Sequence, residues 1–455
     1  MSIVLAGVAA AATVAAGYFL IKGYKPAIVL LLVGLLLALT STALRPGFDI
    51  LGKKETSGSR WLDVITMFES VAGSQLTGVG LIIMAAGGFS AYMNKIGASR
   101  ALVEMVATPI AKIKYPYVLL VATYLLGAVL FMFIPSAAGL AILLLVLVVP
   151  VLTAARVTPA AAGAVIVTAS ALPMGPASGT SVLAAKTVGL SPVVYFVHNQ
   201  LIVAIPTAIA IALTHLFVQR HYDRRSLETY GQIEVAADTA TTPGPRLYGL
   251  FLILPIALLI TFSPLVNKQI ELSTVGAFVA VWLLAMLCEV VRHRSLRQAT
   301  DAAATLFTGM GKMFGSVVAL VIAAQIFAQG LTSTGVIDLL VDAGKRVGAG
   351  AVIMTVLFTA IVGLVTFLTG SGVGAFSAFA GLVPDLAKGL GASAPAIITP
   401  MEFASGLLRS MSPVSGAVIA VAAGVGINPL DIVRRTALPM LVGAVVMTIS
   451  SLVLL

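Results

Sequence analysis

One interrupted apolar segment occurs twice in this chain and limits its fold more than any other feature. Residues 176–189 read PASGTSVLAAKTVG and residues 413–426 read PVSGAVIAVAAGVG, so an offset of 237 (413 minus 176) relates them. In each copy a Pro-x-Ser-Gly motif interrupts a long apolar run midway, where a continuous helix would otherwise be expected. Matching Gly/Pro-broken hydrophobic segments in two halves of a chain are typical of a secondary transporter's binding site.

The chain as a whole is too apolar to be soluble. Of its 455 residues 59% are hydrophobic and 10% are charged, and the mean hydropathy is +1.09. Such a chain could not cover its apolar surface in water, so the sequence predicts an all-α polytopic membrane protein whose surroundings are a lipid bilayer. The net charge of +10 does not require a nucleic-acid partner, because the cations lie at the ends of apolar runs. The single cysteine, Cys288, excludes internal disulfides.

About ten membrane spans can be read along the chain. The first, residues 2–21, has no basic segment before it and is expected to remain as a span. Residues 219–246 are rich in charges, Thr and Pro, which predicts a polar cytoplasmic linker between two halves, residues 1–218 and 247–455. The other single spans are expected near residues 27–43, 76–93, 197–218, 247–262, 275–291, 314–329 and 436–455.

Four further apolar segments do not read as simple spans. Residues 117–154 and 352–386 each contain two apolar arms around a small polar turn, and we expect two re-entrant hairpins. Residues 159–190 and 394–426 contain the two breaks, and each is expected to cross the membrane once as a broken helix.

The basic residues predict opposite orientations for the two halves. Residues 93–115 contain four cations against one acid, whereas their counterpart, residues 332–349, is balanced. Conversely, Arg434 and Arg435 occupy positions at which the first half has no such pair. Opposite charge asymmetry at matching positions indicates two inverted-topology repeats with both termini outside. Most cations, Lys312 among them, then lie on the cytoplasmic side.

Helix ends inside the membrane predict a binding site for a small anion. At each hairpin tip and each break a helix would begin in mid-membrane, and each N-terminus carries about +0.5 charge, or about +2 for four. A dianion suits that charge, and helix C-terminal carbonyls suit Na⁺. Alternatively, the small residues only allow close helix packing. The predicted substrate-binding residues are Ser136, Ala137, Gly139, Ser178, Gly179, Thr180, Thr369, Gly370, Ser371, Gly372, Ser405, Arg409, Ser412, Ser415 and Gly416, and candidate Na⁺ positions lie near Ser136, Pro176, Ser371 and Pro413.

Two charged residues stand out within an apolar run. Arg409 precedes the second break, and an arginine at mid-membrane costs about 2.5–3.5 kcal/mol, so it needs a partner. We expect it to grip a substrate carboxylate, with an internal ion pair to Glu402 as the alternative. Glu402 is a candidate carrier of a coupling proton, because apolar surroundings favour a neutral carboxyl group. The alternative is that its side chain extends to the membrane interface.

Motifs of other function classes are absent from the sequence. There is no GxxxxGK[ST] segment to hold ATP, and neither HExxH nor GxSxG occurs. We therefore expect neither an ATP-driven pump nor an enzyme, and no cofactor beyond Na⁺ or H⁺ as a coupling ion.

Three stretches resemble the DcuC family of anaerobic C4-dicarboxylate carriers: GGFSAYMNKIGAS, FLTGSGVGAFSAF and SGLLRSMSPVSGAVIAVAAG. The resemblance runs nearly end to end, and the repeat is distantly similar to the divalent anion/sodium symporters of the ion transporter superfamily. It implies a homodimer in a bacterial inner membrane that moves succinate, fumarate or malate by symport or exchange. It also implies an elevator motion, with substrate between residues 136–139, 176–181, 369–374 and 405–416.

The chain departs from the expected pattern at two of these motifs. Val373 stands where an Asn is expected, and residues 405–409 read SGLLR where relatives have Ser-Asn-Leu-Gly-Arg. These changes leave the exact substrate and the coupling ion open. One alternative is a carrier of another carboxylate, such as citrate, an amino acid or a monocarboxylate. The alternative from another class is an anion channel.

Overall fold

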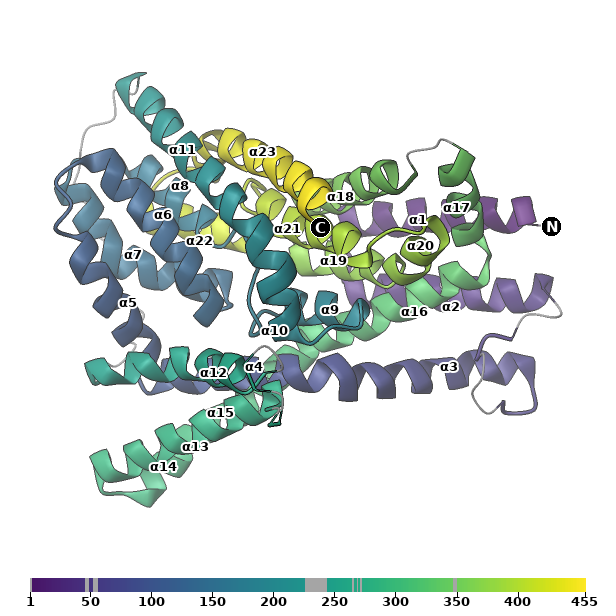
Figure 1. Ribbon diagram of the computed structural model, residues 1–455, viewed down its shortest axis with the longest axis horizontal. Coiled ribbons are helices and arrows are strands. Elements are labelled where there is room, and N and C mark those ends of the chain that lie inside the picture. Colours follow the sequence, from purple (N-terminus) through teal and green to yellow (C-terminus); the bar gives the residue numbers. More distant parts are fainter. Residues whose placement is uncertain are drawn as a thin grey trace.

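The computed structural model describes residues 2–45, 49–51, 56–225, 244–263, 266–267, 269–270, 272–346 and 350–455. Every regular element within these residues is a helix (Figure 1). Nine helices there are long and apolar enough to cross a membrane, or up to ten if the bent pair α19 and α20 forms one span. The predicted all-α polytopic membrane protein is confirmed.

Among the described residues, the first half contains eleven α-helices and two π-helical turns. Their bounds are α1 Ser2–Ile21, α2 Pro26–Leu44, α3 Arg60–Gln75, η1 Leu76–Gly80, α4 Leu81–Lys95, α5 Ala98–Ile110, α6 Pro116–Phe133, α7 Ala137–Ala154, α8 Pro159–Thr168, α9 Gly179–Thr187, α10 Pro192–Tyr195, η2 Phe196–Gln200 and α11 Leu201–Arg225.

The described residues of the second half also form helices. Its elements are η3 Arg246–Gly249, α12 Leu250–Thr261, α13 Thr274–His293, α14 Leu296–Ala303, α15 Thr305–Met313, η4 Phe314–Val318, α16 Ala319–Ser333, α17 Val336–Arg346, α18 Gly350–Thr369, α19 Gly372–Ala380, α20 Val383–Leu390, α21 Ala394–Arg409, α22 Gly416–Val425 and α23 Pro429–Leu454.

Two helices are much longer than the sequence predicts. The spans expected at 76–93 and 314–329 are parts of continuous helical segments of 36 and 38 residues, Arg60–Lys95 and Leu296–Ser333. We call these two segments the arms. At about 1.5 Å per residue each exceeds the roughly 30 Å apolar core of a bilayer. The prediction failed because the first turns of the arms are amphipathic and read as polar loop, although α3 buries one face against its neighbours.

The predicted linker is only partly described. Residues 219–225 are helical, because α11 extends to Arg225, so this part of the linker prediction is wrong. Residues 226–243 of the predicted linker lie outside the described residues.

Local structure repeats between the two halves at the offsets seen in the sequence. The π-helical turns η1 and η4 begin at Leu76 and Phe314, which are 238 positions apart (314 minus 76). The half-helices α9 and α22 begin at Gly179 and Gly416, which are 237 positions apart (416 minus 179). The same secondary structure at nearly equal offsets indicates that the two halves share one local arrangement of helices.

The four interruptions are short non-helical links. Residues 134–136 join α6 to α7 and residues 370–371 join α18 to α19, and we call these tip 1 and tip 2. Residues 169–178 separate α8 from α9 and residues 410–415 separate α21 from α22, and we call these break 1 and break 2. At both tips the N-cap serine accepts a hydrogen bond from the main chain three residues later.

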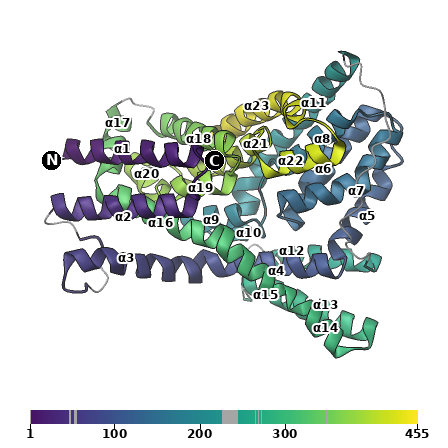
Figure 2. The same ribbon diagram turned by 180° about the vertical axis from the view of Figure 1, so that it is seen from behind.

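The half-helices after the breaks pack on the opposite half of the chain. The helix α22 contacts α7 and α8, whereas α9 contacts α19 and α21. Figures 1 and 2 accordingly show α22 near α6, α7 and α8 at one end of the molecule, with α18, α19 and α20 toward the other. This exchange brings both tips and both breaks into the middle of the structure.

A buried ion pair ties α23 to α11. Arg435 Nη1 lies 2.5 Å from Asp223 Oδ1, and both side chains are almost fully buried. Asp223 also accepts a hydrogen bond of 2.9 Å from Thr158 at the start of α8. The Gln219 side chain donates to the Arg435 carbonyl at 3.0 Å and lies 3.1 Å from the ring of His215. These contacts hold the last helix against the first half of the chain.

Candidate functional site

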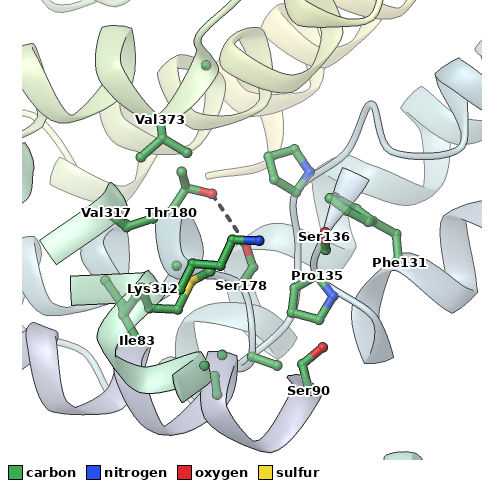
Figure 3. A pocket seen from close by; sticks show the side chains of 18 of the residues that line it. Ile83, Ser90, Phe131, Pro135, Ser136, Ser178, Thr180, Lys312, Val317 and Val373 are labelled. Atoms are coloured by element: carbon green, nitrogen blue, oxygen red, sulfur yellow. Dashed lines mark hydrogen bonds between the residues drawn. The ribbon is translucent and has the colours of Figure 1, made fainter. Parts of the chain in front are cut away.

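A cavity of about 300 Å³ lies where the tips and breaks approach the arms (Figure 3). Tip 1, break 1, the first residues of α19 and the end of α21 form one wall. The other wall comes from α4, α15 and η4 of the arms. The lining residues are Ile83, Ala86, Gly87, Ser90, Ala91, Asn94, Phe131, Pro135, Ser136, Pro173, Ala177, Ser178, Gly179, Thr180, Gly309, Lys312, Met313, Val317, Gly372, Val373, Ser405, Gly406 and Arg409.

The cavity contains part of the predicted site. The predicted residues that line it are Ser136, Ser178, Gly179, Thr180, Gly372, Ser405 and Arg409. The predicted residues outside the lining are Ala137, Gly139, Thr369, Gly370, Ser371, Ser412, Ser415 and Gly416. Of these, Ser412 donates to the Phe367 carbonyl at 2.6 Å. The hydroxyl of Thr369 donates to its own helix at Val365.

Three of the four expected helix N-termini reach the cavity. Ser136 and Ser178 are the N-cap residues of α7 and α9, and Gly372 is the first residue of α19. The fourth N-terminus, at Gly416, is not part of the lining, because α22 packs away against α7 and α8. At about +0.5 each, the three N-termini contribute about +1.5 of partial charge.

Close main-chain approach holds the tips and breaks together. A Cβ atom added at Gly406 would lie 2.2 Å from the carbonyl oxygen of Ala171 in break 1. A Cβ atom added at Gly372 would lie 2.4 Å from the carbonyl oxygen of Ser405. Only glycine allows these contacts, which bring α21 against break 1 and tip 2 against α21.

Hydrogen bonds to break 1 hold the side chain of Arg409. Its Nη2 donates to the Ser170 carbonyl at 2.7 Å and contacts the Ser170 hydroxyl at 3.3 Å. The guanidinium carbon lies 6.0 Å from the centre of the Phe131 ring. The buried Nε has no hydrogen-bond partner among the described residues. No ion pair joins Arg409 to Glu402 in the described structure, so that sequence-based alternative is wrong.

The sequence reasoning missed a second cation in the cavity. Lys312, expected in a cytoplasmic segment, belongs to α15 and lines the cavity. Figure 3 shows its side chain extended from the side of Ile83 and Val317 toward Ser178. The only signal in the sequence was a lysine close to an apolar run, which equally fits a span end. With Arg409 and Lys312 present and no carboxylate in the lining, the cavity is chemically suited to an anion.

Glu402 lies behind the cavity in a fully buried polar network. Its Oε2 accepts hydrogen bonds from the Tyr195 hydroxyl at 3.0 Å and from Gln200 Nε2 at 2.9 Å. Tyr195 also lies 3.0 Å from the hydroxyl of Thr399. The Ser405 hydroxyl donates to the main-chain carbonyl of Glu402 at 2.6 Å, and Ser405 lines the cavity. Glu402 therefore does not line the cavity but lies next to a residue that does.

Gln200 connects Glu402 to break 1. Its Oε1 accepts from the Gly175 N–H and from the Ser181 hydroxyl, both at 3.0 Å. Its Nε2 donates to the Pro173 carbonyl at 3.3 Å as well as to Glu402. Because a main-chain N–H only donates and a carbonyl only accepts, these contacts fix the orientation of the amide. Glu402 Oε2 already accepts two hydrogen bonds, so in a neutral Glu402 the proton lies on Oε1.

Comparisons with known proteins identify the family of this chain. The sequence model of the family described as "DcuC: C4-dicarboxylate anaerobic carrier" matches residues 8–455. The chain is 34% identical over 444 residues to the probable anaerobic C4-dicarboxylate transporter DcuC of Vibrio cholerae, covering 97% of this chain and 96% of the relative. It is 31% identical over 434 residues to the anaerobic C4-dicarboxylate transporter DcuC of Escherichia coli K12, covering 95% and 93%.

A solved structure shares the fold. The YdaH transporter of Alcanivorax borkumensis, whose crystal structure was described as revealing an unusual topology, superimposes with a TM-score of 0.65 over 93% of this chain and 98% of its own. Its sequence identity is 16%, so this likeness concerns the fold alone. The family match and the two relatives show that the chain belongs to the DcuC family of C4-dicarboxylate carriers, which are transporters and not enzymes.

Proposed function

We propose that this chain is a secondary active carrier of C4-dicarboxylates such as succinate, fumarate and malate in a bacterial inner membrane. The observation that carries the proposal is the cavity lined by Arg409 and Lys312 without any carboxylate. The positive charges of the two cations and the three helix N-termini are opposite to the charge of a small dianion and attract it. The volume of about 300 Å³ is at the lower end of ligand pockets, which suits a substrate with a four-carbon chain.

The carrier would work by an elevator motion of two inverted repeats. The nearly equal offsets of 238 between η1 and η4 and 237 between α9 and α22 support the repeat, and the opposite charge asymmetry supports the inversion. The tips and breaks would form the moving unit and the arms the scaffold. Both termini would lie outside, and the functional unit would be a homodimer.

Transport would be coupled to an ion, as symport or exchange. The favoured coupling ion is a proton, carried on Glu402 Oε1. Oε2 accepts two hydrogen bonds, whereas Oε1 has no hydrogen-bond partner among the described residues. Na⁺ near the tips and breaks, at Ser136, Pro176, Ser371 or Pro413, is the alternative coupling ion.

A carrier of another carboxylate is the second candidate. Val373 favours it, because this apolar side chain lines the cavity beside Gly372, where an amide would offer a hydrogen bond to a second carboxylate. A thermal-shift screen of mono-, di- and tricarboxylates, with and without Na⁺, separates these substrates. We expect succinate, fumarate or malate to give the largest stabilisation, since a ligand that binds the folded state raises its Tm.

Counterflow tests carrier against channel. Unlabelled succinate inside proteoliposomes accelerates uptake of labelled succinate by a carrier, because the loaded site returns faster than the empty one. An anion channel shows no such acceleration, and that result would overturn the proposed function.

A further inference from the structure

We infer that Lys312 holds the second carboxylate of the substrate in one transport state only, so that substrate affinity differs between the two sides of the membrane. This inference rests on the proposed function and deepens it. It assigns a binding role to a residue on the arms, outside every tip and break.

The first step is the availability of the Lys312 ammonium group. Figure 3 shows the side chain reaching across the cavity toward Ser178, with Thr180 and Ser136 on either side. Within the described residues none of the ion pairs involves Lys312. A lysine in that position is a point charge suited to a carboxylate.

The second step is that the two cations lie on different parts of the structure. Arg409 ends α21 and is bound to Ser170 in break 1. Lys312 lies on α15, which packs mainly against α4 of the other arm. A dicarboxylate between them would therefore bridge the tips and breaks to the arms. When the tips and breaks move, Arg409 stays with the substrate and Lys312 does not.

The third step is the counterpart of Lys312 in the other half. The offset of 238 that relates η4 to η1 maps Lys312 onto Ser74 (312 minus 238), two residues before each π-helical turn. Ser74 is exposed, and its hydroxyl donates to the Val71 carbonyl of its own helix at 3.0 Å. In the opposite state the substrate would meet this uncharged serine, so the second carboxylate would lose its cation.

The test measures the succinate KM from each side, in right-side-out and inside-out vesicles that contain the full chain. Lys312→Gln raises the KM about tenfold or more on one side, as expected for a lost charge-assisted hydrogen bond, and leaves it within about twofold on the other. In the proposed topology the affected side is cytoplasmic. Ser74→Lys, the matched variant, lowers the KM on the opposite side.

Two controls separate binding from folding. Lys312→Arg keeps the charge and retains most of the one-sided affinity, and an unchanged Tm for Lys312→Gln excludes a structural role. On the affected side, Lys312→Gln also lowers the ratio of the affinity for succinate to the affinity for the monocarboxylate butyrate.

Three outcomes would contradict the inference: equal KM changes on both sides, no change on either side, or loss of folding in Lys312→Gln together with an unchanged KM on both sides in Ser74→Lys. Absence of succinate counterflow in the wild type would instead refute the proposed function. The two failures are therefore distinguishable.

Discussion

The guanidinium of Arg409 and the main chain of Ser170 form a 2.7 Å hydrogen bond between the two halves of the chain. Ser170 lies in break 1, two residues after α8, and Arg409 is the last residue of α21. The bond fixes one edge of the guanidinium, while its Nε has no protein partner in the described structure. A charged donor held in place with one unused group is pre-organised for an anionic ligand.

Arg409→Ala should abolish dicarboxylate transport without unfolding the protein. Loss of a charge-assisted hydrogen bond worth up to about 3 kcal/mol corresponds to a fall in uptake of about 100-fold. Labelled succinate uptake into proteoliposomes measures the loss, and size-exclusion chromatography in detergent checks the fold. Normal uptake by a folded Arg409→Ala protein would exclude this residue from the site.

Glu402→Gln should remove the response of uptake to a proton gradient while succinate exchange continues. The amide has nearly the same shape and keeps an acceptor for Tyr195 and Gln200, but it takes up no proton. Uptake into vesicles with an imposed pH gradient, acidic on the substrate side, measures the effect. The proton-carrier role is rejected if the gradient still accelerates uptake by the variant to the wild-type extent.

Gly406→Ala should destabilise the protein and impair transport. The new methyl group would lie 2.2 Å from the Ala171 carbonyl, so α21 and break 1 must separate, at a cost of about 1–3 kcal/mol. Gly416→Ala is the matched control, because nothing lies within 4 Å of a Cβ atom there. Thermal unfolding and uptake are measured for both, and equal behaviour of the two variants would contradict the described packing.

Arg435→Ala should destabilise the protein far more than Arg434→Ala. The first change leaves Asp223 as a buried charge that has lost its cation, which costs about 3–5 kcal/mol. Arg434 lies 3.5 Å from Asp431, and 72% of its side-chain surface is exposed, so its pair contributes about 0–1 kcal/mol. Thermal unfolding in detergent compares the variants, and similar Tm values for the two would argue against the α11–α23 contact.

The sequence was sufficient to predict features that depend on local patterns. The Pro-x-Ser-Gly motifs after Ser170 and Arg409 lie where the structure has breaks, because Pro and Gly interrupt helices whatever surrounds them. The first predicted span is a helix with the same bounds, Ser2–Ile21, because an unbroken apolar run of that length favours a helix in a membrane.

Features that depend on distant packing were not predictable. The partners of Glu402, Tyr195 and Gln200, are more than 200 positions away along the chain. Lys312 lines the cavity because the unexpectedly long helical segment that carries it, Leu296–Ser333, forms part of the cavity wall. The N-terminus at Gly416 was expected in the site, but α22 packs against α7 and α8, a choice that no local pattern reveals.

Substrate protection of the cavity is the most direct measurement of where the dicarboxylate binds. In a Ser178→Cys variant, a small thiol reagent labels the new cysteine at the N-terminus of α9, and native Cys288 on α13 serves as an internal reference. Our account predicts that succinate slows labelling of position 178 severalfold while Cys288 reacts at an unchanged rate. Equal labelling of position 178 with and without saturating succinate, in a variant that still transports, would contradict the account.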